Sequence, residues 1–226
     1  MLIEIPNVLT VEEVAQCRDA LAKANWADGR YSAGYLSHAV KENSQLPDSD
    51  PTARKLGEVI LLALENNPLF TSAALPLKVL PPLFNRYAQA QSYGGHIDGA
   101  IRPMEGTPHR LRTDLSATLF LAAPESYEGG ELVVKDSFGE RSIKLPAGSM
   151  VLYPGTSVHR VEPVTQGVRL AAFFWIQSMV RDGTQRTILF ELDTAIQRLA
   201  ADVPSHPSLV ELAGVYHNLL RCWADS

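Results

Sequence analysis

Residues 77–178 form a succession of short apolar, β-branched and aromatic segments separated by turn signals. The turn signals include Gly-Gly, Asp-Ser-Phe-Gly, Pro-Ala-Gly and Gln-Gly. This alternation predicts short strands joined by tight connections, and about eight such strands in one stretch favour a β-sandwich or jelly roll. The predicted strands are residues 79–88, 93–98, 115–122, 131–135, 140–145, 149–153, 158–164 and 167–177.

The residues before this stretch are typical of helices. Thr10 and Glu13 form a capping-box pattern, which predicts a helix over residues 11–24. Residues 28–50 are rich in Gly, Ser, Asn, Asp and Pro, and this composition predicts a long loop. An Asp-Pro pair then predicts a second helix over residues 51–66, which the sequence Asn-Asn-Pro would end. We expect these helices to cover a sheet.

Helical periodicity returns after residue 182, in two segments separated by Pro204 and Pro207. Each segment has an apolar stripe. The first stripe is Ile188, Leu189, Leu192, Ile196 and Leu199, and the second is Leu209, Leu212, Tyr216, Leu219, Leu220 and Trp223. The second stripe is wide enough to need burial against the core or a partner chain, so one expectation is a homo-oligomer formed through these helices.

The chain as a whole is expected to be an α+β protein. Its 226 residues, with 46% hydrophobic content, are enough to bury a sizeable core with an appendage. We predict three parts: an N-terminal helical cover (1–76), a jelly-roll core (77–178) and a C-terminal helical appendage (182–226).

Composition disfavours several kinds of partner. Lys and Arg total 20 against 25 Asp and Glu, and no long basic run is present, so neither nucleic acid nor a membrane is an expected partner. The longest apolar run, VILLAL at 59–64, is too short to span a bilayer, and the first ten residues lack a secretion signal. We therefore expect a cytoplasmic protein. Cys17 and Cys222 lack CxxC spacing and are expected to be buried thiols.

The sequence GGHIDG at 94–99 places an imidazole and a carboxylate two positions apart. Side chains alternate between the faces of a strand, so His96 and Asp98 would point the same way. This pair alone is weak evidence, because a histidine hydrogen-bonded to a carboxylate is a common structural arrangement. His159, on a distant predicted strand, would complete the two-histidine, one-carboxylate ligand set of non-haem iron(II) oxygenases. The alternative is a structural histidine at a strand end.

Arg169 lies in the sequence GVRLAAFFWIQ, where both faces of the predicted strand are apolar. A guanidinium in such surroundings needs an anionic partner, because an unpaired buried charge is costly. No acidic residue on that strand supplies one. Arg169 would therefore either pair with a distant Asp or Glu, reach water at the strand end, or bind the far carboxylate of a dicarboxylate ligand in a bidentate fork.

Together these residues resemble the iron(II)- and 2-oxoglutarate-dependent dioxygenases of the prolyl 4-hydroxylase type. The resemblance extends over RYAQAQSYGGHID at 86–98, DLSATLFLAAPESYEGGELVV at 114–134 and LPAGSMVLYPGTSVHRVEPVTQGVRLAAFFWIQS at 145–178. Nearly the full length of the chain, including its helical end, is similar to the bacterial PKHD-type hydroxylases.

This resemblance implies a double-stranded β-helix core, with His96, Asp98 and His159 on iron(II) and Arg169 on the cosubstrate 2-oxoglutarate. L-ascorbate is a further cofactor to be expected. The implied reaction uses O2 and couples decarboxylation of 2-oxoglutarate to succinate with hydroxylation of a substrate. The family label suggests peptidyl prolyl or lysyl hydroxylation, whereas an implied setting near iron uptake suggests a siderophore-type substrate, and no residue chooses between them.

The tyrosines ahead of the His-x-Asp pair show one departure from this family. Prolyl hydroxylases of this type often have a glycine midway between two tyrosines, but here Tyr87 and Tyr93 flank Ala90. The ligands are untouched, so the departure concerns local backbone geometry. Tyr87 is a candidate second donor to the far carboxylate of 2-oxoglutarate, with a buried core tyrosine as an equal alternative.

The polar segment 99–113 follows directly after the candidate ligand pair. It is a candidate lid, in which Arg102, Arg110 and Arg112 would meet an acidic substrate. A solvated surface loop is an equal alternative, and His109 within it is expected to be exposed.

Two other classes of function stay open at this point. A cupin-like protein could bind a metal and a metabolite without turnover, but such a function would not explain a guanidinium at Arg169 in apolar surroundings. A nucleic-acid demethylase could use the same triad, but it would need a basic groove. A zinc hydrolase is disfavoured, since no H-E-x-x-H motif is present.

Overall fold

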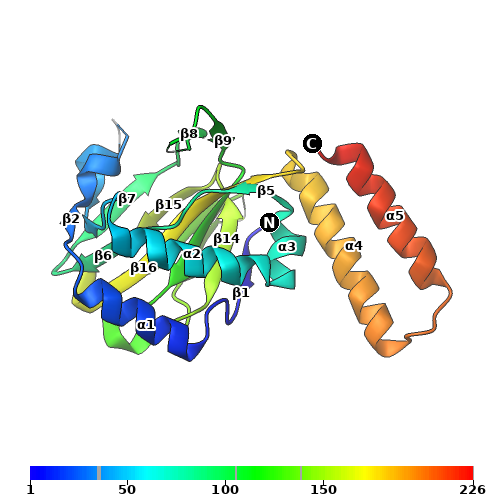
Figure 1. The fold of residues 1–226 in the computed structure, drawn as a ribbon, viewed down its shortest axis with the longest axis horizontal. Coiled ribbons are helices and arrows are strands. Elements are labelled where there is room, and N and C mark those ends of the chain that lie inside the picture. The colour runs from blue at the N-terminus through cyan, green and yellow to red at the C-terminus, as the bar shows by residue number, and fades with distance from the viewer. Residues whose placement is uncertain (35–36, 105, 138, 226) are drawn as a thin grey trace.

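The computed structural model describes residues 1–34, 37–104, 106–137 and 139–225, and its core is a pair of antiparallel sheets (Figure 1). The strands of the larger sheet lie in the order β1 (Ile3–Ile5), β14 (Met150–Pro154), β10 (Leu115–Phe120), β16 (Val164–Ser178), β6 (Leu83–Ala88), β4 (Ser44–Gln45) and β2 (Ala27–Asp28). Two further strands, β5 (Pro76–Val79) and β11 (Tyr127–Gly129), pair with opposite ends of β16.

The smaller sheet faces the larger one. Its order is β13 (Gly139–Ile143), β12 (Leu132–Asp136), β15 (Val158–Val161), β7 (Ser92–His96) and β3 (Lys41–Glu42). The apolar side chains between the sheets form one cluster, which includes Phe120, Leu132, Val151 and Val161. This arrangement confirms the predicted jelly roll, the double-stranded β-helix.

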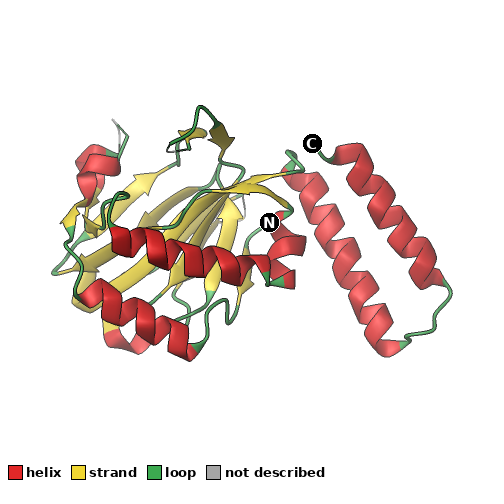
Figure 2. Cartoon of the chain, viewed as in Figure 1, coloured by secondary structure: helices red, strands yellow, loops and turns green. Residues whose placement is uncertain are grey.

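Helices cover the outer face of the larger sheet (Figure 2). The capping box predicted at Thr10 is present: the Thr10 hydroxyl accepts from Glu13 N, and the Glu13 carboxylate accepts from Thr10 N, so α1 (Val11–Ala22) begins where expected. Asp50 caps α2 (Pro51–Glu65). Apolar residues of both helices are buried against the sheet, including Cys17, Leu21, Ile60 and Leu64.

The prediction that Asn-Asn-Pro simply ends a helix was incomplete. A third helix, α3 (Pro68–Ala74), begins immediately afterwards, with the Asn67 side chain accepting from Phe70 N at 2.9 Å. The same residue types that end one helix can also start the next, because asparagine is a good N-cap and proline fits the first helical turn.

Several predicted strand boundaries were wrong. The predicted strand 79–88 is divided into β5 and β6, since Pro81 and Pro82 cannot donate to a sheet ladder. The predicted loop 28–50 contains the short strands β3 and β4, the last residue of β2, and the 3₁₀ turns Gly29–Ser32 and His38–Val40. The segment 99–113 contains a small hairpin of β8 (Ile101–Pro103) and β9 (Arg110–Arg112), which shares no strand with either large sheet.

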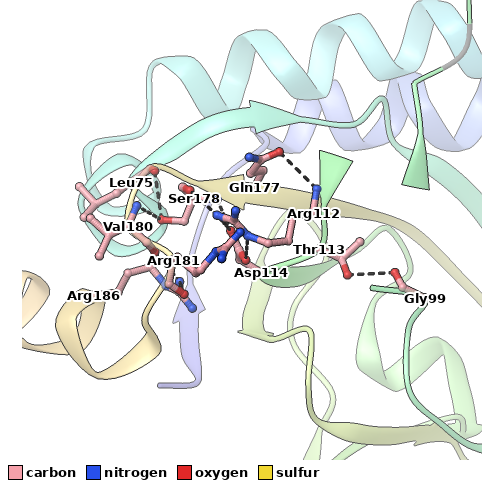
Figure 3. Close-up of polar contacts among 10 residues, drawn as sticks. All are labelled: Leu75, Gly99, Arg112, Thr113, Asp114, Gln177, Ser178, Val180, Arg181 and Arg186. Carbon is pink, nitrogen blue, oxygen red and sulfur yellow. Dashed lines mark hydrogen bonds and ion pairs between the residues drawn. The ribbon is translucent and has the colours of Figure 1, made fainter. Parts of the chain in front are cut away.

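The C-terminal helices α4 (Gly183–Asp202) and α5 (Ser208–Trp223) form an antiparallel pair that extends away from the β core (Figure 1). Arg186 anchors the base of the pair, donating to the carbonyls of Val180 and Arg181 at 2.6 and 2.9 Å (Figure 3). Leu189 is buried there against the core. Within the described part of the chain, no helix is long and apolar enough to cross a bilayer.

A polar junction connects this base to the β8–β9 hairpin (Figure 3). The Asp114 carboxylate accepts from Arg112 Nε at 2.6 Å and from Ser178 N at 2.9 Å. Because Arg112 ends β9 and Ser178 ends β16, this carboxylate ties the hairpin to the strand that leads into the C-terminal helices.

The two cysteines differ in environment. Cys17 is buried, as predicted, and burial raises the pKa of its thiol to about 11. The prediction that Cys222 is also buried was wrong, because it lies on the solvent side of α5.

Ala90 shows the backbone consequence of the missing glycine. It lies in the tight turn between β6 and β7 with φ of 65°, a left-handed conformation that favours glycine. We therefore expect Ala90→Gly to raise the free energy of unfolding by about 0.5–1 kcal/mol, as relief of strain exceeds the added entropy of the unfolded chain.

Urea denaturation would measure this difference. Ala88→Gly, two residues earlier in β6, is the control and should lower stability, because glycine weakens a strand that has no such strain. An Ala90→Gly protein no more stable than the parent would contradict the prediction.

Candidate active site

Three ligand-type side chains meet where β7 and β15 pair. His96 ends β7 and is the direct cross-strand partner of His159 in β15. Asp98 lies two residues beyond the end of β7, so the predicted strand 93–98 was too long, although both side chains still face one point. One ligand atom from each of the three residues lies within 4.8 Å of the others, and His159 Nε2 is 3.8 Å from Asp98 Oδ2. This donor set fits iron(II).

The histidine rings are oriented for metal binding by their own backbone neighbours. Nδ1 of His96 lies 2.9 Å from the carbonyl oxygen of Gly94, and Nδ1 of His159 lies 3.1 Å from that of Ser157. A carbonyl oxygen can only accept, so each Nδ1 carries the proton and each Nε2 keeps a lone pair for a metal. Burial and the neighbouring His159 hold the pKa of His96 well below its usual range, which keeps its ring neutral.

Asp98 is held from the opposite sheet. The hydroxyl of Ser116, on β10, donates to Asp98 Oδ2 at 2.7 Å. The sequence contained only a weak signal for this contact, because Ser116 is one of two hydroxyl residues, with Thr118, in a mostly apolar strand, and nothing in it indicated the partner. Ser116 therefore fixes the direction of a carboxylate that no strand constrains.

Arg169 is a buried cation without a matching anion. Its side chain is 1% exposed, and it takes part in none of the ion pairs among the described residues. Its Nη1 donates a long hydrogen bond of 3.4 Å to Asn85 Oδ1, and its Nε has no partner in the described structure. Such a guanidinium fits a bound carboxylate.

Tyr87 lies directly opposite Arg169, in the neighbouring strand β6. The Arg169 guanidinium carbon is 5.4 Å from the centre of the Tyr87 ring. Burial raises the pKa of Tyr87 to about 12, against the opposing effect of Arg169, so its hydroxyl keeps a proton to donate. Tyr87 and Arg169 therefore lie side by side on neighbouring strands.

A single cavity is lined by all five predicted site residues. It also contains Lys41, Arg102 and Trp175, of which Lys41 and Trp175 were not predicted. Lys41 comes from the predicted loop 28–50, where its short strand was not recognised.

The three arginines of the candidate lid have different environments. Arg102 lines the cavity, whereas Arg110 is exposed and Arg112 pairs with Asp114. Of these three arginines, only Arg102 thus lines the cavity. His109 is exposed, as expected.

The jelly roll, the His-Asp-His cluster and the unpaired Arg169 define a 2-oxoglutarate and iron(II) dependent oxygenase. In agreement, residues 82–177 match the family model of the 2OG-Fe(II) oxygenase superfamily, and residues 183–225 match that of the PKHD-type hydroxylase C-terminal domain. The solved structure of a Pseudomonas putida prolyl-4-hydroxylase is similar in fold, with a TM-score of 0.51 and 21% identity, over 78% of this chain and 92% of that one.

Curated relatives give the family. The chain is 58% identical over 225 residues to the PKHD-type hydroxylase PiuC of Pseudomonas aeruginosa, and 57% identical over 226 residues to a PKHD-type hydroxylase of Parvibaculum lavamentivorans, with 100% of each chain covered. The protein belongs to the PKHD-type hydroxylase family.

Family membership decides between an enzyme and a metal-binding protein without turnover. The protein is an iron(II)- and 2-oxoglutarate-dependent dioxygenase, with 2-oxoglutarate and O2 as cosubstrates. A metal-binding protein without turnover is therefore disfavoured.

Proposed function

We propose that the protein hydroxylates a peptidyl or siderophore-type substrate linked to iron uptake, with iron(II) held by His96, Asp98 and His159. Arg169, assisted by Tyr87, binds the far carboxylate of 2-oxoglutarate. The observation that carries this proposal is the meeting of the ligand cluster and an unpaired buried guanidinium in one cavity. The substrate class and the link to iron uptake rest on the family resemblance.

In this proposal, iron(II) supplies the oxidising chemistry when bound together with 2-oxoglutarate and O2. The residues of the chain position the reactants. Both histidines present Nε2, because their Nδ1 protons are held by carbonyl oxygens, and Ser116 holds Asp98 in direction. Arg169 orients 2-oxoglutarate from the far end, and apolar walls that include Leu132 limit access of water.

The three-part division of the chain also remains a proposal. We propose that residues 77–178 contain the catalytic machinery, covered by residues 1–76. The C-terminal pair, residues 182–226, is then a candidate for contact between chains, because its apolar side chains are mostly only half-buried.

Mass spectrometry would test the proposed reaction. Purified protein with iron(II), 2-oxoglutarate and O2 would be incubated with peptide and siderophore pools from cell extract. We expect a product that gains one oxygen atom, formed only when 2-oxoglutarate is present and accompanied by succinate. If no such product forms in either the peptide pool or the siderophore pool, the proposed substrate class is wrong.

Ser116→Ala tests the support of the metal ligands. Loss of this hydroxyl frees the Asp98 carboxylate to rotate, so we expect iron(II) affinity to fall about tenfold or more, with little change in the affinity of the iron-loaded protein for 2-oxoglutarate. Anaerobic equilibrium dialysis would measure the iron affinity.

The control is Thr118→Ala, which removes a hydroxyl two residues along the same strand. It should bind iron(II) as the parent does. Equal affinities of the Ser116→Ala protein and the parent would show that the hydrogen bond to Asp98 has no role in metal binding.

A further inference from the structure

Two cations in the cavity have no role in the proposed iron and 2-oxoglutarate chemistry. Arg102, on β8, lies with its guanidinium carbon 3.4 Å from the centre of the Trp175 ring. Stacking of this kind uses the face of the guanidinium and leaves its in-plane N–H groups available. Its buried Nε has no hydrogen-bond partner in the described residues.

Lys41 is the second of these cations, and it is 3% exposed. Its ammonium donates to Ser32 Oγ at 2.8 Å and to Gln45 Oε1 at 2.9 Å, which are neutral acceptors. Burial lowers the pKa of Lys41 to about 8, and the nearby charge of Arg102 adds to the effect. Lys41 and Arg102 thus line the same cavity, and the burial of Lys41 weakens the screening of the repulsion between them.

The charge balance of the cavity calls for a further anion. Asp98 is the one carboxylate among the described residues that line it, against the three cations Lys41, Arg102 and Arg169. The charges of iron(II) and of the 2-oxoglutarate dianion cancel, and Asp98 offsets one cation. Two positive charges then remain among the lining residues. Asp48 lies near enough to interact with both cations, but it does not line the cavity, and neither Lys41 nor Arg102 belongs to an ion pair of the described structure.

2-Oxoglutarate cannot supply this anion while it is bound to Arg169. Arg169 and Trp175 lie on the same face of β16, six residues apart, which corresponds to roughly 20 Å at about 3.3 Å per residue. A five-carbon diacid is too short to reach from one to the other. Trp175 instead pairs across the sheet with Ser116, the residue that holds Asp98, so Arg102 lies at the level of the metal ligands.

We propose that Arg102, stacked on Trp175 and flanked by Lys41, binds a carboxylate group of the substrate that is hydroxylated. This inference rests on the proposed function, and it narrows the substrate to a carboxylate-bearing molecule. The planar guanidinium donates two parallel hydrogen bonds to the carboxylate, and the Lys41 ammonium contributes charge from the side.

The test compares acids with their neutral amides. N-acetyl amino acids and the corresponding N-acetyl amino acid amides would be titrated by calorimetry, without O2, into protein saturated with iron(II) and 2-oxoglutarate. We expect the acids to bind the parent at least about tenfold more tightly than the amides, as for hydrogen bonds to a charged group. In Arg102→Gln this preference should disappear.

Arg110→Gln is the matched control, because Arg110 is an exposed arginine on the other strand of the same hairpin. It should keep the preference for acids. Equal affinity for acids and amides in the parent, including no binding of either, or a preference that persists in Arg102→Gln, would overturn the inference.

Absorption of the iron–2-oxoglutarate chelate separates this inference from the proposed function. If the parent forms no chelate, the proposed function fails. If the parent forms it but Arg102→Gln binds 2-oxoglutarate more than about tenfold less tightly, Arg102 belongs to cosubstrate binding and the inference alone is overturned.

Discussion

His159→Ala is expected to give a folded protein that no longer binds iron(II) tightly or forms succinate from 2-oxoglutarate. His159 contributes one of three candidate ligands, and its backbone is held by pairing of β15 with both β12 and β7, so removal of the imidazole leaves the sheet in place. Loss of a group that only orients a metal ligand lowers metal affinity by up to about 100-fold. Loss of the ligand itself should therefore lower the affinity for iron(II) by more than about 100-fold. Anaerobic dialysis, succinate assay and circular dichroism would measure these effects.

The matched control is His109→Ala, which removes an exposed imidazole from the β8–β9 hairpin region. This variant should bind iron(II) and form succinate as the parent does. Undiminished succinate formation by His159→Ala would remove His159 from the site.

Arg169→Ala should weaken binding of 2-oxoglutarate while leaving iron(II) binding intact. The variant leaves a carboxylate in a buried pocket without its partner, at a cost of about 2–4 kcal/mol. That cost corresponds to a loss of affinity of about 30- to 1,000-fold. Arg169→Lys should recover part of the loss, because it keeps the charge but not the bidentate fork.

Anaerobic titration of 2-oxoglutarate into the iron(II) protein, followed by absorption of the chelate, would measure this affinity. Arg160→Ala is the control: Arg160 lies on β15, and its guanidinium is already paired with Glu140 and Glu162. It should leave the affinity unchanged. If Arg169→Ala bound 2-oxoglutarate as tightly as the parent, the role proposed for Arg169 would be wrong.

The candidate site could largely be predicted because side chains alternate between the two faces of a strand, so the sequence spacing of two residues tells whether they point the same way. His96 and Asp98 share a side through the two-residue period, and Arg169 was conspicuous as a charge in an apolar strand. Ser116 and Lys41 could not be predicted in the same way. Each reaches the site through a contact between distant segments, and such contacts depend on sheet order and register, which local patterns do not determine.

The fold was predictable where one local signal acted alone. The capping box at Thr10 gave the start of α1, and turn signals gave most strands of the core. Predicted strand boundaries were wrong where two local signals conflicted. At Pro81 and Pro82, for example, prolines interrupt an otherwise apolar run that is typical of a strand. The two-residue strands between residues 28 and 50 have no periodicity to detect, since they are held by pairing with β6 and β7.

The two cysteines differ in exposure, so a thiol reagent should label the protein at one site only. The Cys17 thiol is buried and stays protonated at neutral pH, because its pKa is raised to about 11, so a maleimide reagent would not reach it. Cys222 is exposed on α5. A spin label would therefore attach at one position without any engineered cysteine. The distance between two such labels would report directly whether the C-terminal helix pairs of two chains meet in solution.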